Sequence, residues 1–219
     1  MRDTRKNEEY FEKYLEFQYS RIEKKYAKLA EADDIKKQRV LMSLTGYEID
    51  LLKAEFSFGA TKEKMKSLLS KAVSIVTEYR NITYEDLLNL LSMSIMLNEI
   101  NESLELIRAN KDKVFNDRLL NALALFIQGK EPVWNDSLAL PKDFAELDKV
   151  FKSPAKDSEL LAYLNSWYDN HSGYSWYNSH LSTNDTYCGY WSFESAAIAI
   201  ILGISDSKLK DSKYYPFWK

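Results

Sequence analysis

The side chains that could perform chemistry gather in one polar stretch near the C-terminal end of the chain, residues 169–194. A histidine there could act as a general base, a cysteine as a nucleophile, and carboxylates as metal ligands. The enzymatic hypothesis that this composition permits is a hydrolase using His171, His180 and Glu194. The complete set of such residues is Asp169, His171, His180, Asp185, Cys188 and Glu194.

The spacing of these residues matches no catalytic or metal-binding motif. The sequence has no His-Glu-x-x-His helix, no Gly-x-Ser-x-Gly turn, no phosphate-binding glycine loop and no dinucleotide fingerprint. The simpler interpretation is that the polar groups satisfy buried backbone ends within an aromatic-rich loop. Cys188 is then a small buried apolar residue, and Glu194 lies near the positive end of a helix dipole. We therefore predict no catalytic residue, no metal and no cofactor.

The polar stretch leads into an almost wholly apolar run, from Phe193 to Leu202. A helix that is apolar on all sides must be enclosed by other elements, and a membrane crossing would need about 20 apolar residues. The run therefore predicts a buried helix over residues 192–202, ended by Gly203 in a left-handed conformation. We expect the nearby side chains to form the structural core of this motif: Trp176, His180, Tyr187, Tyr190, Trp191, Phe193 and Glu194.

The N-terminal part of the chain shows helical periodicity throughout. Only 6 glycines and 4 prolines occur in 219 residues, which favours a few long elements over many short strands. Apolar residues follow helical spacing in five stretches that are joined by short turns, a pattern typical of antiparallel helices in a bundle. The five predicted helices cover residues 3–32, 35–58, 61–79, 83–109 and 112–128.

A break in composition, with two prolines and one tryptophan, lies at residues 131–141. Shorter helices are expected after it, at residues 142–152 and after Ser153-Pro154, where the serine can cap a helix and the proline suits its first turn. We therefore predict an all-α multi-helix bundle, with an N-terminal domain over residues 1–130 and a C-terminal domain over residues 131–219. Because the linker is short and carries a tryptophan, the two domains are expected to pack as one body.

The charge of the chain is unevenly distributed. Residues 131–219 hold eight lysines, no arginine and 12 acidic residues, a net charge of −4. This balance argues against a nucleic-acid-binding surface there, which would need a basic patch, and is compatible with docking on a basic protein surface. An ordinary solvated face is the alternative. The candidate contact residues are Glu131, Asp136, Asp143, Glu146, Asp148, Asp157 and Glu159.

Two further observations concern the compartment. Cys188 is the single cysteine, so no intramolecular disulfide can form. The first residues are charged and no apolar segment follows them, so no secretory signal is recognised and a cytoplasmic location is expected.

Several segments resemble the PoNi-type immunity proteins. The C-terminal domain of that family is similar to Trp176-Tyr177 and to the run from Asn184 to Ala197, followed by residues 201–211 and Tyr214-Tyr215-Pro216. The N-terminal domain of the family resembles the opening Met1-Arg2-Asp3 with its long charged helix, and Phe56-Ser57-Phe58-Gly59 before a new helix.

The resemblance implies an all-helical antitoxin that is not a catalyst. Such proteins are encoded beside polymorphic toxins, often PoNe-type DNases delivered by bacterial secretion systems, and they bind the toxin to protect the producer and its kin. The expected partner is therefore a cognate toxin protein, neutralised by occlusion of its active site, with no direct contact to nucleic acid or membrane. The alternatives are a helical adaptor or scaffold with another protein partner, and the hydrolase described above.

Overall fold

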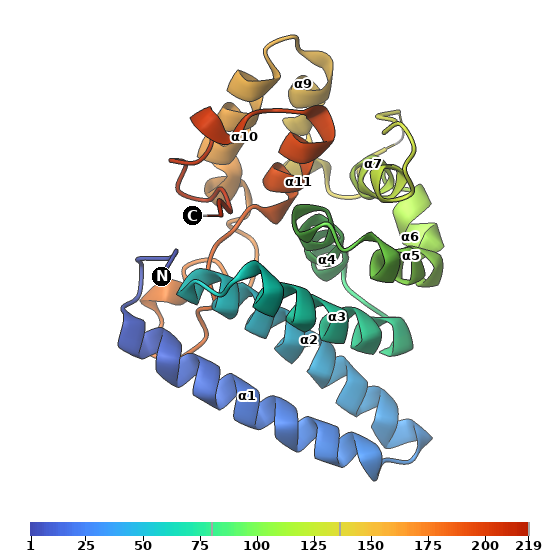
Figure 1. The fold of residues 1–219 in the computed structure, drawn as a ribbon, viewed down its shortest axis with the longest axis vertical. Helices are drawn as coiled ribbons and strands as arrows, with labels where there is room; N and C mark the ends of the chain where they lie inside the picture. The colour runs from blue at the N-terminus through green and yellow to red at the C-terminus, as the bar shows by residue number, and fades with distance from the viewer. Residues whose placement is uncertain (80, 136, 219) are drawn as a thin grey trace. The chain divides into compact units, whose positions relative to one another are not determined.

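The structure is a computed structural model that describes residues 1–79, 81–135 and 137–218, with residue 102 described by its backbone alone. These residues form eleven α-helices and two short 3-10 helices and contain no β-strand (Figure 1), which confirms the all-α class. Within the same residues, no helix is both long enough and apolar enough for a bilayer crossing. The helices are α1 Glu8–Ala30, α2 Asp34–Phe58, α3 Lys62–Tyr79, α4 Tyr84–Leu97, α5 Ile100–Ala109, α6 Lys111–Phe115, α7 Arg118–Ile127, α8 Pro141–Phe144, α9 Leu147–Lys152, α10 Lys156–Asn170 and α11 Phe193–Leu202.

The chain divides into two compact units. The first unit comprises residues 1–90 and 178–189, and the second comprises residues 91–177 and 190–219. The division passes through α4, and a short C-terminal segment belongs to the N-terminal unit. The bounds of the compact units differ from the expected domain boundary after residue 130. The division into domains at residue 130 stays a prediction.

The first unit is built on three long antiparallel helices, α1, α2 and α3, in which α2 packs against both neighbours (Figure 1). Side-chain oxygens of Asn7 and Asp33 accept hydrogen bonds from the first turns of α1 and α2 and so fix where these helices begin. Gly59 ends α2 with a φ of 112°, and a Cβ atom built there would lie 3.2 Å from the backbone nitrogen of Met1. The N-terminus therefore passes close against the end of α2.

Residues 1–6 do not continue α1, so the expectation that the first helix begins near Asp3 was wrong. The backbone amides of Arg2 and Asp3 both donate to the carbonyl oxygen of Ser57, at 2.8 and 3.0 Å. Asp3 is 1% exposed. These contacts to α2 replace the hydrogen bonds that a longer α1 would have made.

Three of the expected helices are broken. Residues 83–109 form two helices because Asn98 adopts a left-handed φ of 57° and the amide of Glu99 turns back to the carbonyl oxygen of Ser94 at 2.9 Å. Residues 112–128 also form two, because the Asp117 carboxylate accepts a hydrogen bond from the Leu120 amide and starts α7. The expected helix over residues 142–152 is divided between α8 and α9.

The second unit surrounds α11. Helix α10 packs against α8, α9 and α11, while α7 packs against α11 and α5. Residues Phe193 to Ala199 are buried, which confirms the buried helix over most of its length, and Gly203 caps it with a φ of 64°. Ile200 is 46% exposed, so enclosure does not extend to the C-terminal end of the helix.

Candidate functional site

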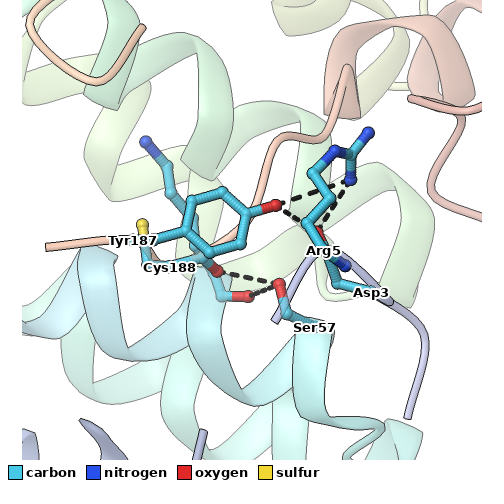
Figure 2. A network of polar contacts seen from close by, with 6 residues as sticks. Asp3, Arg5, Ser57, Tyr187 and Cys188 are labelled. Atoms are coloured by element: carbon cyan, nitrogen blue, oxygen red, sulfur yellow. Dashed lines mark hydrogen bonds and ion pairs between the residues drawn. The ribbon is translucent and has the colours of Figure 1, made fainter. Parts of the chain in front are cut away.

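Within the first unit, Tyr187 holds the segment 178–189 against the N-terminal residues of the chain (Figure 2). The Tyr187 hydroxyl donates a 2.5 Å hydrogen bond to Oδ2 of Asp3, which also pairs with Nη1 of Arg5 at 2.9 Å. Tyr10 completes the attachment, since its hydroxyl donates to the Tyr187 carbonyl oxygen and accepts from the Tyr187 amide, both at 2.9 Å. These bonds join Tyr187 to Asp3 and Tyr10, which are far from it in the sequence. Tyr187 therefore has a structural role.

Cys188 lies in the same segment and is buried. Its carbonyl oxygen accepts a 2.8 Å hydrogen bond from the Ser57 hydroxyl (Figure 2), and its Sγ atom lies 4.0 Å from Oδ1 of Asp50. Burial, together with the negative charge of Asp50, raises the pKa of the Cys188 thiol to about 12. The thiol is therefore protonated at neutral pH, whereas a cysteine nucleophile needs a lowered pKa.

Glu194, in the second unit, is buried and accepts three hydrogen bonds at one oxygen. The donors to Oε1 are the Tyr163 hydroxyl at 2.8 Å, the Trp167 indole nitrogen at 2.7 Å and the Ser192 hydroxyl at 2.6 Å. A tyrosine hydroxyl is therefore among the donors that satisfy the enclosed Glu194 carboxyl group. A carboxyl group held in this way connects α10 to the first turn of α11 and so has a structural role.

The two histidines belong to different compact units. His171 is buried, and its Nδ1 lies 2.6 Å from the carbonyl oxygen of Trp167, so the Nδ1 proton is donated to the backbone. His180 lies beside the Tyr187 ring, with ring centres 6.1 Å apart. In the described part of the chain, no group of three or more His, Cys, Asp or Glu side chains is placed to hold a metal ion.

The remaining motif residues of the second unit pack in an aromatic cluster. Trp176 stacks on Trp167 with ring centres 5.4 Å apart, and Tyr190 lies against Trp176 and Tyr168 at 5.5 and 5.0 Å. Phe193 is fully buried and Trp191 is half-buried.

The acidic candidates of residues 131–219 do not all face solvent. Asp143 is 8% exposed and accepts a 2.8 Å hydrogen bond from the Tyr174 hydroxyl, so its expected surface position was wrong. Asp136, another of the acidic candidates, lies outside the described residues.

Two further candidates, Asp148 and Asp157, already bind cations. Asp148 pairs with Arg118 at 2.7 Å and Lys152 at 3.6 Å, and accepts a 2.8 Å hydrogen bond from the Trp134 indole. Partial burial opposes ionisation of Asp148, but the Trp134 hydrogen bond and the two cations together lower its pKa. Asp157 pairs with Lys208 at 2.5 Å, and this contact is the main cause of its lowered pKa.

Three glutamates keep the character expected of a contact surface. Glu131 and Glu146 are exposed and Glu159 is half-buried, and none of the three has an ion pair within the described residues. Glu159 borders a shallow depression of about 310 Å³ that is also lined by Asp148, Lys149 and Lys152. The free acidic surface is therefore smaller than the count of acids suggested.

One surface feature was missed from the sequence, an open groove of about 420 Å³ on the first unit. Residues of α1, α2 and α3 line the groove, and one of these residues is the buried Glu48 of α2. One pattern in the sequence could have indicated the groove. The α2 helix has glutamates at positions 48 and 55, seven residues apart, and the α1 helix has tyrosines at positions 19 and 26 with the same spacing.

The sequence matches the family model of the PoNe immunity protein (PoNi) N-terminal domain over residues 2–109, and that of the C-terminal domain of PoNe immunity proteins over residues 115–217. The fold is similar to the crystal structure of protein PA2201 from Pseudomonas aeruginosa, with a TM-score of 0.76 and 18% sequence identity, covering 98% of this chain and 88% of that one. No curated protein sequence matches.

Proposed function

Because the chain belongs to the PoNe immunity protein family, we propose that it binds a cognate toxin protein and neutralises it, and that this toxin is a DNase. The observation that carries the proposal is the match of the N-terminal and C-terminal family models to nearly the whole chain. An immunity protein acts by binding its toxin, so it needs a surface for that partner rather than a catalytic centre.

The proposed mechanism is occlusion of the toxin's active site by one bound immunity protein. A DNase must bind phosphates with lysine and arginine side chains, so its active-site surface is basic. An acidic protein surface can occupy such a site and is attracted to it over a long range, which speeds association at low salt. Glu131, Glu146 and Glu159 are the best candidates, because they lack the cations that already neutralise Asp148 and Asp157.

The chemistry-bearing side chains support a binder rather than a catalyst. The Cys188 thiol has a raised pKa, and the Glu194 carboxyl group is enclosed by three donors. Both groups have a structural explanation, and neither is free to attack a substrate or move a proton. We place the protein in the cytoplasm of the producing cell, where a DNase would otherwise reach the chromosome.

Co-expression with the toxin encoded beside this chain tests the proposal. Cells that make both proteins should survive, and the two should purify together. In a nuclease assay, activity should fall in proportion to added immunity protein and reach its floor at one immunity protein per toxin. Cell death on co-expression, or undiminished nuclease activity at a large excess of the chain, would refute the proposal.

A further inference from the structure

A tyrosine–glutamate pair occurs twice between α1 and α2, one heptad apart. On α1 the tyrosines are residues 19 and 26, and on α2 the glutamates are residues 48 and 55. Because the helices are antiparallel, Tyr19 meets Glu55 and Tyr26 meets Glu48. The Tyr19 hydroxyl donates to Glu55 Oε1 at 2.6 Å, and the Tyr26 hydroxyl donates to Glu48 Oε1 at 2.9 Å.

The first pair is completed by a cation. The ammonium group of Lys64, at the start of α3, lies 2.7 Å from Glu55 Oε1 and 5.8 Å from the centre of the Tyr19 ring. Glu55 is 1% exposed, so this lysine supplies the positive charge that a buried carboxylate requires. The arrangement is therefore a tyrosine donor, a buried carboxylate and a cation over the aromatic ring.

The second pair lacks that cation. Glu48 is 2% exposed, yet within the described residues no lysine or arginine nitrogen lies within 4.0 Å of its carboxyl oxygens. Lys71, one heptad after Lys64, borders the groove but does not form this ion pair. Glu48 instead borders the open groove, which Tyr19, Ile22, Tyr26 and Leu51 also line.

A buried Glu48 carboxylate without an ion pair is unfavourable for the isolated chain. Burial raises the pKa of Glu48, and the Tyr26 hydrogen bond and the charge of Lys71 offset only part of this effect. A binding partner that supplied a cation would relieve this cost, whereas a purely structural position would more simply hold an apolar residue.

We propose that the groove binds an arginine side chain of the toxin, which takes the place at Glu48 that Lys64 takes at Glu55. The guanidinium group would bind the Glu48 carboxylate, and its planar face would lie against the tyrosine rings, a combination for which arginine is better suited than lysine. The aliphatic part of the side chain would contact Ile22 and Leu51, in the apolar part of the groove. This inference rests on the proposed toxin-binding function and assigns to it an anchoring contact separate from the acidic residues of the second unit.

A small-molecule probe tests the groove without the toxin. The full chain, with labelled tyrosine rings, is titrated with N-acetyl-arginine amide and with N-acetyl-citrulline amide, its uncharged isostere, and followed by NMR. Saturable shifts of the Tyr19 and Tyr26 ring signals are expected with arginine only, and they should be lost in Glu48→Gln. Equal shifts with citrulline, or unchanged shifts in Glu48→Gln, would overturn the assignment.

The toxin tests whether the groove is used. Binding to the co-purifying toxin should weaken at least tenfold in Glu48→Gln and stay within twofold of wild type in Glu105→Gln, an equal change of charge at an exposed position of α5. The melting temperature of Glu48→Gln should equal or exceed that of wild type, because the variant removes a buried charge but keeps an acceptor for Tyr26. A variant that binds the toxin as wild type does overturns this inference alone, whereas a wild-type chain that does not bind the toxin overturns the proposed function as well.

Two other occupants of the groove are separated by further variants. If Lys71 were the natural cation of Glu48, Lys71→Gln would lower the melting temperature as much as Lys64→Gln does; we expect a much smaller loss, because Lys71 acts on Glu48 without an ion pair, and toxin binding at least as tight as wild type. If a second copy of this chain filled the groove, wild type would sediment as a dimer and Glu48→Gln as a monomer. Either result would overturn the proposal.

Discussion

The hydroxyl oxygen of Tyr187 lies 2.5 Å from Oδ2 of Asp3, so that a residue near the C-terminal end holds the third residue of the chain. Asp3 is almost wholly buried, and Arg5 is the cation that balances it. The contact explains why the segment 178–189 belongs to the N-terminal compact unit. It also means that the first unit is completed only after most of the second has been synthesised.

Removing that hydroxyl should destabilise the first unit. Tyr187→Phe deletes one donor to a buried carboxylate but leaves the Arg5 ion pair, so we expect a loss of about 1–3 kcal/mol in the free energy of unfolding. Urea denaturation followed by circular dichroism measures it. Tyr79→Phe, at the half-buried last residue of α3, is the matched control and should shift the midpoint little. An unchanged midpoint for Tyr187→Phe would show that the contact is not stabilising.

Glu194 should be a structural residue. Glu194→Ala leaves the hydroxyls of Tyr163 and Ser192 and the indole nitrogen of Trp167 buried without their acceptor. We expect a loss of about 3 kcal/mol or more, because each unsatisfied buried donor has its own desolvation cost. Differential scanning calorimetry should show a lower melting temperature, and Glu131→Ala at an exposed position should not. Normal stability combined with loss of a hydrolytic activity would instead support the enzyme hypothesis.

The Cys188 thiol should be inert in the folded protein. Since burial raises its pKa to about 12, Ellman's reagent at pH 8 should react slowly with the native chain and rapidly after unfolding in urea. The sign of the pH effect follows from the raised pKa. The unfolded chain loses this proton near pH 8.5 and the folded chain near pH 12, so stability should fall as pH rises between these values. Cys188→Ala should reduce that slope, and rapid native labelling at pH 8 would contradict the prediction.

Local signals in the sequence predicted much of the second unit. The apolar run that ends at Gly203 correctly gave α11, because such a run can be stabilised only by enclosure and glycine accepts the left-handed φ. The breaks at Asn98 and Asp117 were missed, although both residue types are common in turns and caps. Uninterrupted apolar periodicity on both sides of each break favoured a continuous helix.

Long-range pairing could not be predicted in the same way. Asp3 resembles a helix cap in sequence, and only the folded chain brings Tyr187 to it. The charge count of residues 131–219 likewise gave no information on which acids are buried or already paired, as Asp143 and Asp148 are. The groove at Glu48 depends on the register between α1 and α2, which a single sequence does not specify.

The acids of the second unit that form no ion pair within the described residues should control the rate of toxin binding. Changing Glu131, Glu146 and Glu159 together to lysine should slow association about tenfold or more at low salt, because long-range attraction becomes repulsion. At high salt the difference from wild type should largely disappear, since screening shortens the range of the field. Stopped-flow association at about 20 mM NaCl, where charges are weakly screened, and at about 500 mM NaCl, where they are strongly screened, measures both. An unchanged rate with a folded triple variant would exclude these residues from the interface.

Asp148 should act on stability rather than on toxin binding. Asp148→Asn removes the charge that pairs with Arg118 and Lys152, and because the group is partly exposed and screened we expect a loss of only about 1 kcal/mol. Its pKa is lowered in the folded chain, so the ionised form contributes stability above the ordinary aspartate pKa of about 3.9 and loses that contribution as pH falls through the folded value. The difference in unfolding free energy between wild type and Asp148→Asn should therefore be constant near neutral pH and shrink towards zero in acid. Asp157→Asn, whose ion pair is exposed, is the control and should show little change at any pH. A difference that grows in acid would show that Asp148 is not held ionised by its neighbours.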